Sequence, residues 1–394
     1  MGKSICLMTS EESFINNYGA ALQGYALSST LSNMGYEVRI VRYDGYVPPR
    51  KYGFLKDVVK RLIHYNKNQL TKEQIAALEQ RKKNEIRYKH EILQRERLFR
   101  DFQNETMNFI SEERMCWDRL CDRPPLCDIY MCGSDQIWNP NFHGGVCDPG
   151  YYLAFAPAGS NKIAYAPSFG CDDIPRTAQK MLHKMLRDFK AISVREASGV
   201  DIVRKYGRRS AEHVLDPTLL IPSSEWRSVS NVPPELPEHY ILCYRFAESG
   251  NTKDMIDRIS KRTGWPVISM PLSAVAMNDD YQTIFEAGPR EFVGLIDKAS
   301  LVCTDSFHAT VFSIIMKTPV CIFLRESYEN GNSMNSRIYS LLHMLHLESN
   351  IIKPDAQLED AMKCIEEKYT EAHELLNGER EKSMNYLKNA LGVN

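Results

Sequence analysis

Short apolar runs alternate with amphipathic stretches along most of this chain. Runs at 4–8, 127–132, 162–166, 191–194, 240–244, 266–270, 301–303 and 320–323 are typical of strands buried on both faces. Helical spacing of apolar residues follows several of them, as at Ala20, Leu22, Leu27 and Leu31. This rhythm of strand, polar turn and helix predicts doubly wound parallel sheets, and hence an α/β fold.

A proline-rich segment divides the pattern in two. Residues 231–238 read NVPPELPE, with three prolines in eight positions, which is typical of a linker. We therefore expect a Rossmann-like domain at 1–230 and a second at 231–394 that ends in charged C-terminal helices.

The stretch 301–323, LVCTDSFHATVFSIIMKTPVCIF, carries the strongest chemical signal. A polar turn with Asp305 and Ser306 separates a buried strand from a helix that begins near His308. Helix N-termini have unpaired N–H groups and bind anions, and Ser306 or Asp305 could cap this one. A histidine in the first helical turn could accept a proton from a substrate. The alternative is a capped crossover helix with an incidental histidine.

Polar residues also follow other strands, where open α/β sheets bind ligands. The run GSDQIWNP after 127–132 places Asp135, Gln136, Trp138 and Asn139 together. Carboxylate and amides can bond sugar hydroxyls, and an indole face can cover a sugar ring. The alternative is a turn with a buried tryptophan anchor.

Two further strand ends carry candidate ligand-binding residues. Asn17 lies in the turn NNYG after the first strand, and this turn lacks the glycine pattern of a dinucleotide site. Arg195 follows 191–194 and could hold a carboxylate or phosphate, or could pair with Glu196.

Charge is unevenly distributed along the chain. The net charge of the 394 residues is −1, which gives no overall indication of nucleic-acid binding. Residues 50–100 contain 15 Lys and Arg against 6 Asp and Glu, a charge of +9 that leaves −10 for the rest. This segment predicts a helical insertion at about 50–110. A basic amphipathic helix can contact an anionic membrane surface, although a solvated charged face is the commoner explanation.

Cysteine spacing and hydropathy indicate a cytoplasmic protein. The 11 cysteines form no C-x-x-C pair, and several lie in apolar runs, so we expect reduced core cysteines and no metal site. No apolar run reaches the length of a membrane span, and the N-terminus reads as a first strand rather than a signal peptide.

Several segments, in this order and spacing, resemble the polysaccharide pyruvyl transferase family. They are NNYGAALQGYAL, CGSDQIWNP, YAPSFG, SVREASGVDIVRKYG, HVLDPTLL, GPREFVGLIDKASLVCTDSFHATVFSIIMKTPV and NSRIYSLLHML. The resemblance covers most of the chain and implies a GT-B-like arrangement of the two domains. It also implies pyruvate transfer from phosphoenolpyruvate, a co-substrate, to the hydroxyls of a sugar in a capsular or other surface polysaccharide or its lipid-linked precursor. The products would be a pyruvate ketal and phosphate, with no cofactor.

The resemblance assigns roles to the candidate residues. His308 matches the family histidine and would act in acid–base catalysis, with Asp305 orienting it and Asp135 as a further catalytic group. Arg195 matches an arginine proposed to hold phosphoenolpyruvate. Asn17, Gln136, Trp138 and Asn139 would bind the acceptor.

One departure from the family pattern concerns the donor site. Many members have an arginine two positions before the histidine, where this chain has Ser306. Lys317, Arg325 or Arg337 would have to supply the missing cation, and we favour Arg337. Two other functions stay open: a GT-B-type glycosyltransferase that uses a nucleotide sugar, and a non-catalytic glycan-binding or scaffold protein. A peripheral position at the inner face of the membrane, through residues 50–100, stays open as well.

Overall fold

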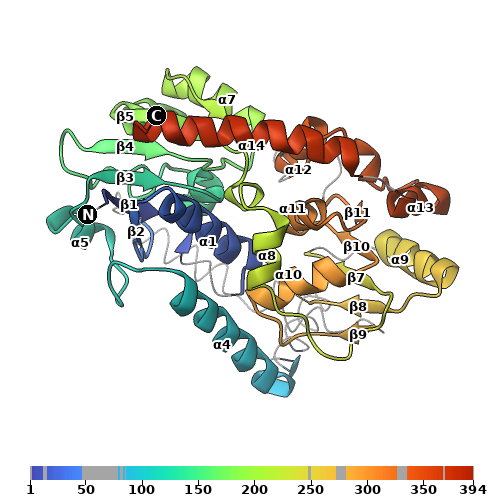
Figure 1. Cartoon of the computed structure of the whole chain (residues 1–394). Coiled ribbons are helices and arrows are strands. Elements are labelled where there is room, and N and C mark those ends of the chain that lie inside the picture. The colour runs from blue at the N-terminus through green and yellow to red at the C-terminus, as the bar shows by residue number, and fades with distance from the viewer. Residues whose placement is uncertain are drawn as a thin grey trace, which may run out of the picture.

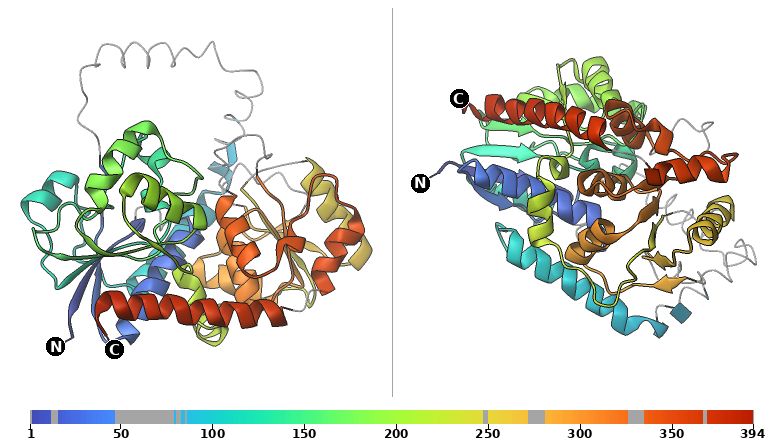
Figure 2. Two further views of the ribbon diagram at one scale, coloured as in Figure 1. Left: turned by 90° about the horizontal axis from the view of Figure 1, so that it is seen from above. Right: turned by 45° about the vertical axis from the view of Figure 1, so that its right-hand side comes forward.

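The computed structural model describes residues 2–11, 16–46, 79, 83–84, 86–246, 250–271, 281–325, 335–366 and 369–393. Their strands form two separate parallel sheets that lie side by side, each flanked by helices (Figures 1 and 2). The sequence-based expectation of an α/β fold with two Rossmann-like units is confirmed.

The first sheet has the strand order β2-β1-β3-β4-β5-β6. Its strands are β1 (Ser4–Met8), β2 (Glu37–Ile40), β3 (Ile129–Cys132), β4 (Asn161–Ala164), β5 (Phe189–Val194) and β6 (Glu212–His213). Ile5 pairs with Val38 on one side and with Ile129 on the other. The crossovers include α1 (Tyr18–Asn33), α6 (Arg176–Leu186) and α7 (Ala197–Ile202). β1 and β3 are largely apolar because helices cover both faces of the sheet.

The second sheet has the order β11-β10-β7-β8-β9. Its strands are β7 (Ile241–Tyr244), β8 (Val267–Ser269), β9 (Gln282–Thr283), β10 (Leu301–Thr304) and β11 (Val320–Ile322). The helices between and after these strands are α9 (Gly250–Thr263), α10 (Pro289–Lys298), α11 (Phe307–Met316), α12 (Ser336–Met344) and α13 (Leu358–Glu366). The predicted strand, turn and helix at 301–323 are therefore present as β10, α11 and β11.

An aromatic cluster joins the two sheets. Tyr18, at the start of α1, stacks on Phe292 of α10 with ring centroids 4.5 Å apart and planes at 8°. Its hydroxyl donates to the backbone oxygen of Ala287 at 2.7 Å. Because these contacts are fully buried, the two domains share one continuous apolar core rather than meeting only at a hinge.

A second aromatic bridge involves α8 (Ser223–Val229), which connects the domains. Trp226 of α8 lies edge-on against Tyr25 of α1 and Phe312 of α11, at 5.5 and 4.8 Å between centroids. Its indole N–H donates to the backbone oxygen of Thr218 at 3.0 Å. One side chain therefore packs against helices from both domains.

The predicted basic insertion lies mostly outside the described residues. Its described part consists mainly of α4 (Lys89–Thr106), followed by α5 (Trp117–Asp122). α4 packs against α1 and α10 and buries Phe99 and Phe102 there, so its apolar face contacts protein (Figure 1). None of the described helices combines the length and the apolar character that crossing a bilayer requires.

The C-terminal helix α14 (Thr370–Leu391) runs from the second domain back to the first (Figures 1 and 2). The Tyr386 hydroxyl donates to the Ala164 oxygen of β4 at 2.8 Å, and the Ser383 hydroxyl accepts from the Leu215 amide at 3.0 Å. The expected boundary at residue 230 grouped this helix with the second domain, whereas these buried contacts are with the first.

We expect Trp226→Ala to lower the free energy of unfolding by about 3–5 kcal/mol, because it leaves a cavity where α1, α8 and α11 meet. The matched control is Trp117→Ala on α5. Because the Trp117 side chain is only half-buried, its removal should lower the free energy of unfolding less. Urea denaturation monitored by circular dichroism measures both variants. Equal losses would show that the Trp226 contacts between the domains add no stability.

Candidate active site

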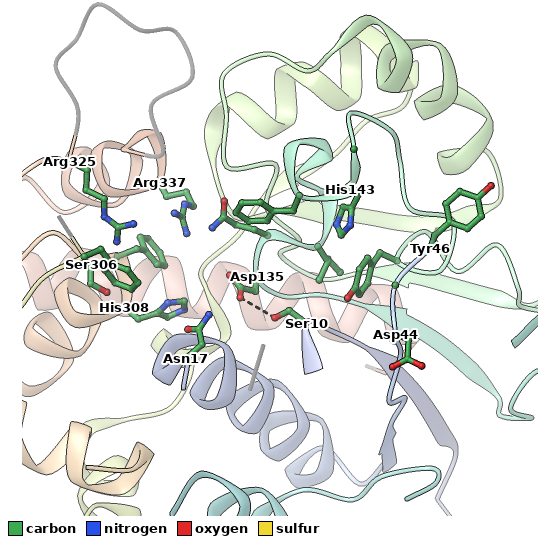
Figure 3. A pocket seen from close by; sticks show the side chains of 18 residues that line it. Ser10, Asn17, Asp44, Tyr46, Asp135, His143, Ser306, His308, Arg325 and Arg337 are labelled. Atoms are coloured by element: carbon green, nitrogen blue, oxygen red, sulfur yellow. Dashed lines mark hydrogen bonds between the residues drawn. The ribbon is translucent and has the colours of Figure 1, made fainter. Parts of the chain in front are cut away.

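A cavity of about 800 Å³ opens between the two domains (Figure 3). It lies where the carboxyl ends of β1 and β3 in the first sheet face that of β10 in the second. Residues of both domains therefore line it: Ser10, Asn17, Asp135 and Gln136 from the first, and Ser306, His308, Arg325 and Arg337 from the second. Strand ends predicted to bind ligands meet at this one place.

His308 is the second residue of α11, and its orientation depends on the first domain. The helix is capped by Ser306, whose hydroxyl accepts from the Ala309 amide at 3.4 Å. Nε2 of His308 lies 3.5 Å from Oδ2 of Asp216, which follows β6. Although burial raises the pKa of the Asp216 carboxyl, His308 and Arg195 together hold it well below its usual range. Asp216 is therefore ionised and able to stabilise a protonated imidazole.

Gly19, in the first turn of α1, leaves space for the His308 ring. A Cβ atom at this position would lie 2.0 Å from Nδ1 of His308, far inside van der Waals contact. The absence of a side chain at Gly19 is therefore what lets the histidine of the second domain pack against the first.

Asp135 and Arg195 form a buried ion-pair network with Asp216. Nη1 of Arg195 lies 2.7 Å from Oδ2 of Asp216, and Nη2 lies 3.4 Å from Oδ1 of Asp135. The Ser10 hydroxyl donates to Oδ2 of Asp135 at 3.0 Å (Figure 3). Burial raises the pKa of Asp135, but the charges of Arg195, His308 and Arg337 and the Ser10 hydroxyl together outweigh burial, and the pKa is lowered. Both carboxylates thus share the Arg195 guanidinium as one of the cations that keep them charged.

Two arginines supply positive charge at the second-domain side of the cavity. Arg337 of α12 is 7% exposed, its guanidinium lies 5.5 Å from the Phe307 ring centroid, and no acidic side chain of the described residues pairs with it. Burial and the charge of Arg195 lower its pKa to about 10, so it stays cationic at neutral pH. Arg325 lies over the Phe246 ring at 3.9 Å, and its Nε is 3.4 Å from Oδ2 of Asp305.

The model of a known protein family matches most of this chain. Residues 17–327 match the family described as polysaccharide pyruvyl transferase. The chain belongs to the polysaccharide pyruvyl transferase family. A comparison with curated protein sequences gives no match. The matched range includes Asn17, Asp135, Arg195, Asp216, His308 and Arg325, whereas Arg337 lies beyond it.

Solved structures with the same fold are distant in sequence. A putative UDP-N-acetylglucosamine 2-epimerase from Listeria monocytogenes has a TM-score of 0.50 and 8% identity, over 100% of this chain and 97% of that one. The glycosyltransferase SnogD from Streptomyces nogalater has a TM-score of 0.41 and 9% identity, over 100% of this chain and 99% of that one. The likeness to the epimerase supports a GT-B-like fold for this member of the pyruvyl transferase family and nothing more specific.

The structure brings several predicted site residues of this pyruvyl transferase family member together. Asn17, Asp135, Gln136, Ser306, His308 and Arg337 all line the cavity. Arg195 does not line it, because its side chain is 1% exposed and both of its Nη atoms face carboxylates. Contrary to the expectation of direct donor contact, Arg195 lies behind Asp135 as a positioning residue.

Asp305 does not orient His308, contrary to the prediction. Its Oδ1 accepts from the Phe246 amide at 2.8 Å and its Oδ2 faces Arg325, so its carboxylate points away from the imidazole. Asp216 faces His308 instead. Asp216 follows β6 at a strand end, but no local sequence pattern indicates that this strand end meets α11 of the other domain.

Trp138 and Asn139 are structural rather than ligand-binding, contrary to the prediction. Trp138 is 1% exposed, stacks on Tyr152 with centroids 4.8 Å apart and donates its N–H to the Tyr151 oxygen. Oδ1 of Asn139 accepts from the Asn141 backbone amide, and Nδ2 of Asn139 donates to Oε1 of Gln136 at 2.9 Å. Here the alternative of a turn with a buried tryptophan anchor is the one observed.

Lys317 does not lie near the proposed donor site, contrary to the prediction. It forms the left-handed C-cap of α11, with φ +62° and an exposed side chain, and therefore lies at the end of the helix opposite His308. Ser10, Tyr46 and His143 line the cavity but were not predicted. Ser10 lies two residues after the end of β1, so its position near a strand end was a usable signal.

The described residues contain no cluster of three or more histidine, cysteine or acidic side chains arranged to hold a metal ion. Free thiols predicted for the core, at Cys6, Cys243, Cys303 and Cys321, are buried.

We expect Arg195→Met to lower the free energy of unfolding at pH 7 by about 3–5 kcal/mol, because two buried carboxylates lose their cation. The pKa values of Asp135 and Asp216 are lowered from 3.8 in the native protein, so the network stabilises the fold above that pH and less as pH falls. The difference between the two proteins should therefore shrink toward pH 3.

The control is Arg204→Met, which removes an exposed pair with Asp201 at 2.6 Å and should change stability little at any pH. Denaturant titrations between pH 3 and 8 give both comparisons. A loss in Arg195→Met that is independent of pH would contradict the charge-based explanation.

Proposed function

We propose that this protein transfers the pyruvyl group of phosphoenolpyruvate to two hydroxyls of a sugar, within a polysaccharide or its lipid-linked precursor. The products are a pyruvate ketal and phosphate. Family membership supports the transferase class, and the meeting of two arginines, a histidine and an aspartate in one cavity supports the donor. Because phosphoenolpyruvate is an intracellular metabolite, the reaction would take place at the cytoplasmic side.

The donor has two anionic groups, and the second-domain side of the cavity has two arginines. Arg337 and Arg325 can each bind a carboxylate or a phosphate through paired N–H donors. The N-terminus of α11, beside Ser306, adds favourable N–H groups and dipole. These cations take the place of the arginine absent at Ser306, and the geometry of Arg337 is the observation that carries the proposal.

In this proposal, His308 and Asp135 carry out the acid–base steps. A protonated His308, stabilised by Asp216, donates its proton to the terminal carbon of phosphoenolpyruvate, so that the adjacent carbon becomes electrophilic. One sugar hydroxyl adds there, the C–O bond to phosphate breaks, and a second hydroxyl closes the ketal. Of the two hydroxyl protons, one replaces that on His308 and the other leaves with phosphate. Asp135, ionised and lining the cavity, can accept a hydroxyl proton during addition.

Calorimetric titration with phosphoenolpyruvate, beside UDP-, GDP- and CMP-sugars, tests the proposal. Saturable binding of phosphoenolpyruvate and release of phosphate in the presence of an acceptor glycan would support it. Binding of a nucleotide sugar without phosphoenolpyruvate would instead identify a glycosyltransferase with this fold.

Arg337→Ala should weaken phosphoenolpyruvate binding about 10- to 100-fold, because a charge-assisted hydrogen bond contributes about 1.5–3 kcal/mol. Lys317→Ala is the matched control: it removes one cation from the far end of α11 and should leave the dissociation constant unchanged. Equal effects of the two substitutions would mean that only the overall charge matters and that Arg337 does not contact the donor.

Gly19→Ala should abolish most of the turnover while phosphoenolpyruvate still binds, because the new methyl group displaces the His308 ring from Asp216. We expect a loss of about 10²–10⁴ in kcat, the usual contribution of a general acid–base group. Gly378→Ala, on the exposed face of α14 with no atom within 4 Å of the new Cβ, should leave turnover unchanged. Full activity of Gly19→Ala would mean that turnover does not require the His308 ring to lie beside Asp216.

A further inference from the structure

A strongly basic face of the first domain lies outside the cavity. Residues 174–211 contain 10 Lys and Arg against 3 Asp and Glu, a charge of +7 that leaves −8 for the rest of the chain. They form α6, β5, α7 and the π-helical turn Val203–Gly207 that follows α7. Arg195 and Glu196 are buried and cancel each other, so the positive excess lies at the surface. Among the residues that the structure describes, no other cation of this segment lines the cavity.

The cations of α6 form one row along the helix. Ala178, Leu182 and Leu186 are buried on one side. At 3.6 residues per turn, the exposed cations fall within about 80° of the circumference on the opposite side. They are Arg176, Lys180, Lys184 and, at the C-cap, Arg187. The helix contains no acidic residue, and the nearest carboxylate in the chain, Asp188, pairs with Arg187 at 3.1 Å.

This row differs from the charged faces of other helices in the same chain. Solvated helix faces usually mix both signs, so that cations pair with carboxylates one turn away. Arg97 pairs in this way with Asp101 in α4, and Lys253 pairs with Asp257 in α9. In α6 the neighbours one turn apart are themselves cations, and like charges at this spacing destabilise a helix. The row therefore has a stability cost that an ordinary solvated face does not explain.

Hydrogen bonds attach a second cationic element to α6. Nη1 of Arg209 donates to the backbone oxygens of Leu186 and Arg187 at 3.1 and 2.6 Å, which caps the C-terminal end of the helix. Nδ1 of His183 lies 3.0 Å from the Gly207 oxygen. The π-helical turn and the residue after it thereby add exposed cations beside α6: Arg204, which pairs with Asp201, Lys205 and Arg208.

The start of α6 adjoins the first-domain edge of the cavity. The Thr177 hydroxyl, in the first turn of the helix, donates to the Gly145 backbone oxygen, and residues 142–144 line the cavity. Phe142 at this edge is 60% exposed. Basic residues accompanied by an exposed aromatic ring are typical of surfaces that lie on a bilayer, whereas a polyanion in solution requires only the charge.

From these observations we propose that the basic face binds the surface of an anionic phospholipid bilayer. The basic face consists of Arg176, Lys180, Lys184, Arg187, Lys205 and Arg208. A bilayer held there lies beside the cavity edge at 142–144. This surface is different from residues 50–100, for which the sequence predicted membrane contact. The inference goes beyond the proposed reaction, because it concerns where the protein is held and not which bonds it makes.

The test is cosedimentation of the full chain with vesicles of phosphatidylglycerol and phosphatidylcholine in equal parts, beside vesicles of phosphatidylcholine alone. We expect binding to the mixed vesicles only, and a loss of binding as salt is added, because salt screens surface charge. Lys180→Gln combined with Lys184→Gln should weaken binding about 30-fold, since each cation near an anionic surface contributes about fivefold.

The matched control is Lys253→Gln combined with Lys261→Gln, which makes the same change in net charge on α9 of the second domain. It should leave vesicle binding unchanged. The proposal is overturned if the native protein does not bind the mixed vesicles, if it binds pure phosphatidylcholine equally well, or if the two double variants lose binding equally. Binding of heparin, a soluble polyanion, without binding of vesicles would instead identify a polyanion site. Because the assay contains neither phosphoenolpyruvate nor a glycan, its result is independent of the proposed function.

Discussion

The buried guanidinium of Arg195 is the interaction on which the rest of the site depends. It lies between Asp135 and Asp216 and, together with His308, lowers the pKa of both carboxylates where burial alone would favour their neutral forms. Asp216 in turn faces His308, while Asp135 faces the cavity. A buried cation behind the cavity thus helps to set the charge state of the groups that would contact a ligand.

The distribution of charge in the cavity agrees with the proposed reaction. Arg337, in the first turn of α12, and Arg325, after β11, supply positive charge on the second-domain side, whereas Asp44 and Asp135 lie on the first domain. Such a division fits a small anionic donor at one end and a sugar at the other. Asp135 lies between them, where hydroxyl and donor carbon would have to meet (Figure 3).

Much of the fold could be predicted from the sequence, because buried parallel strands and amphipathic helices have distinct local patterns. The turn with Ser306 and His308 is an example: strand, cap and helix are all encoded within 301–323. Strand ends also marked Asp135 and Asn17 correctly as part of one site, since parallel strands bring their carboxyl ends to the same edge.

Contacts between the domains could not be predicted in this way. The pairing of Asp216 with His308 joins residues 92 positions apart in different domains, and no local pattern encodes it. The prediction for Trp138 failed for a related reason. An indole that follows a strand can either stack on a sugar or pack in the core, and its stacking on Tyr152 shows that it packs in the core. Lys317 has the right charge, but the length of α11 separates it from the site.

The packing of the His308 ring against Gly19 also makes the proposed acid depend on contact between the two domains. The imidazole belongs to one domain, and both its supporting carboxylate and the glycine that receives it belong to the other. Water between the two domains would weaken the attraction between these charges many times. The proposed acid therefore depends on the apolar core that the two domains share, because this core keeps the imidazole beside its counter-ion.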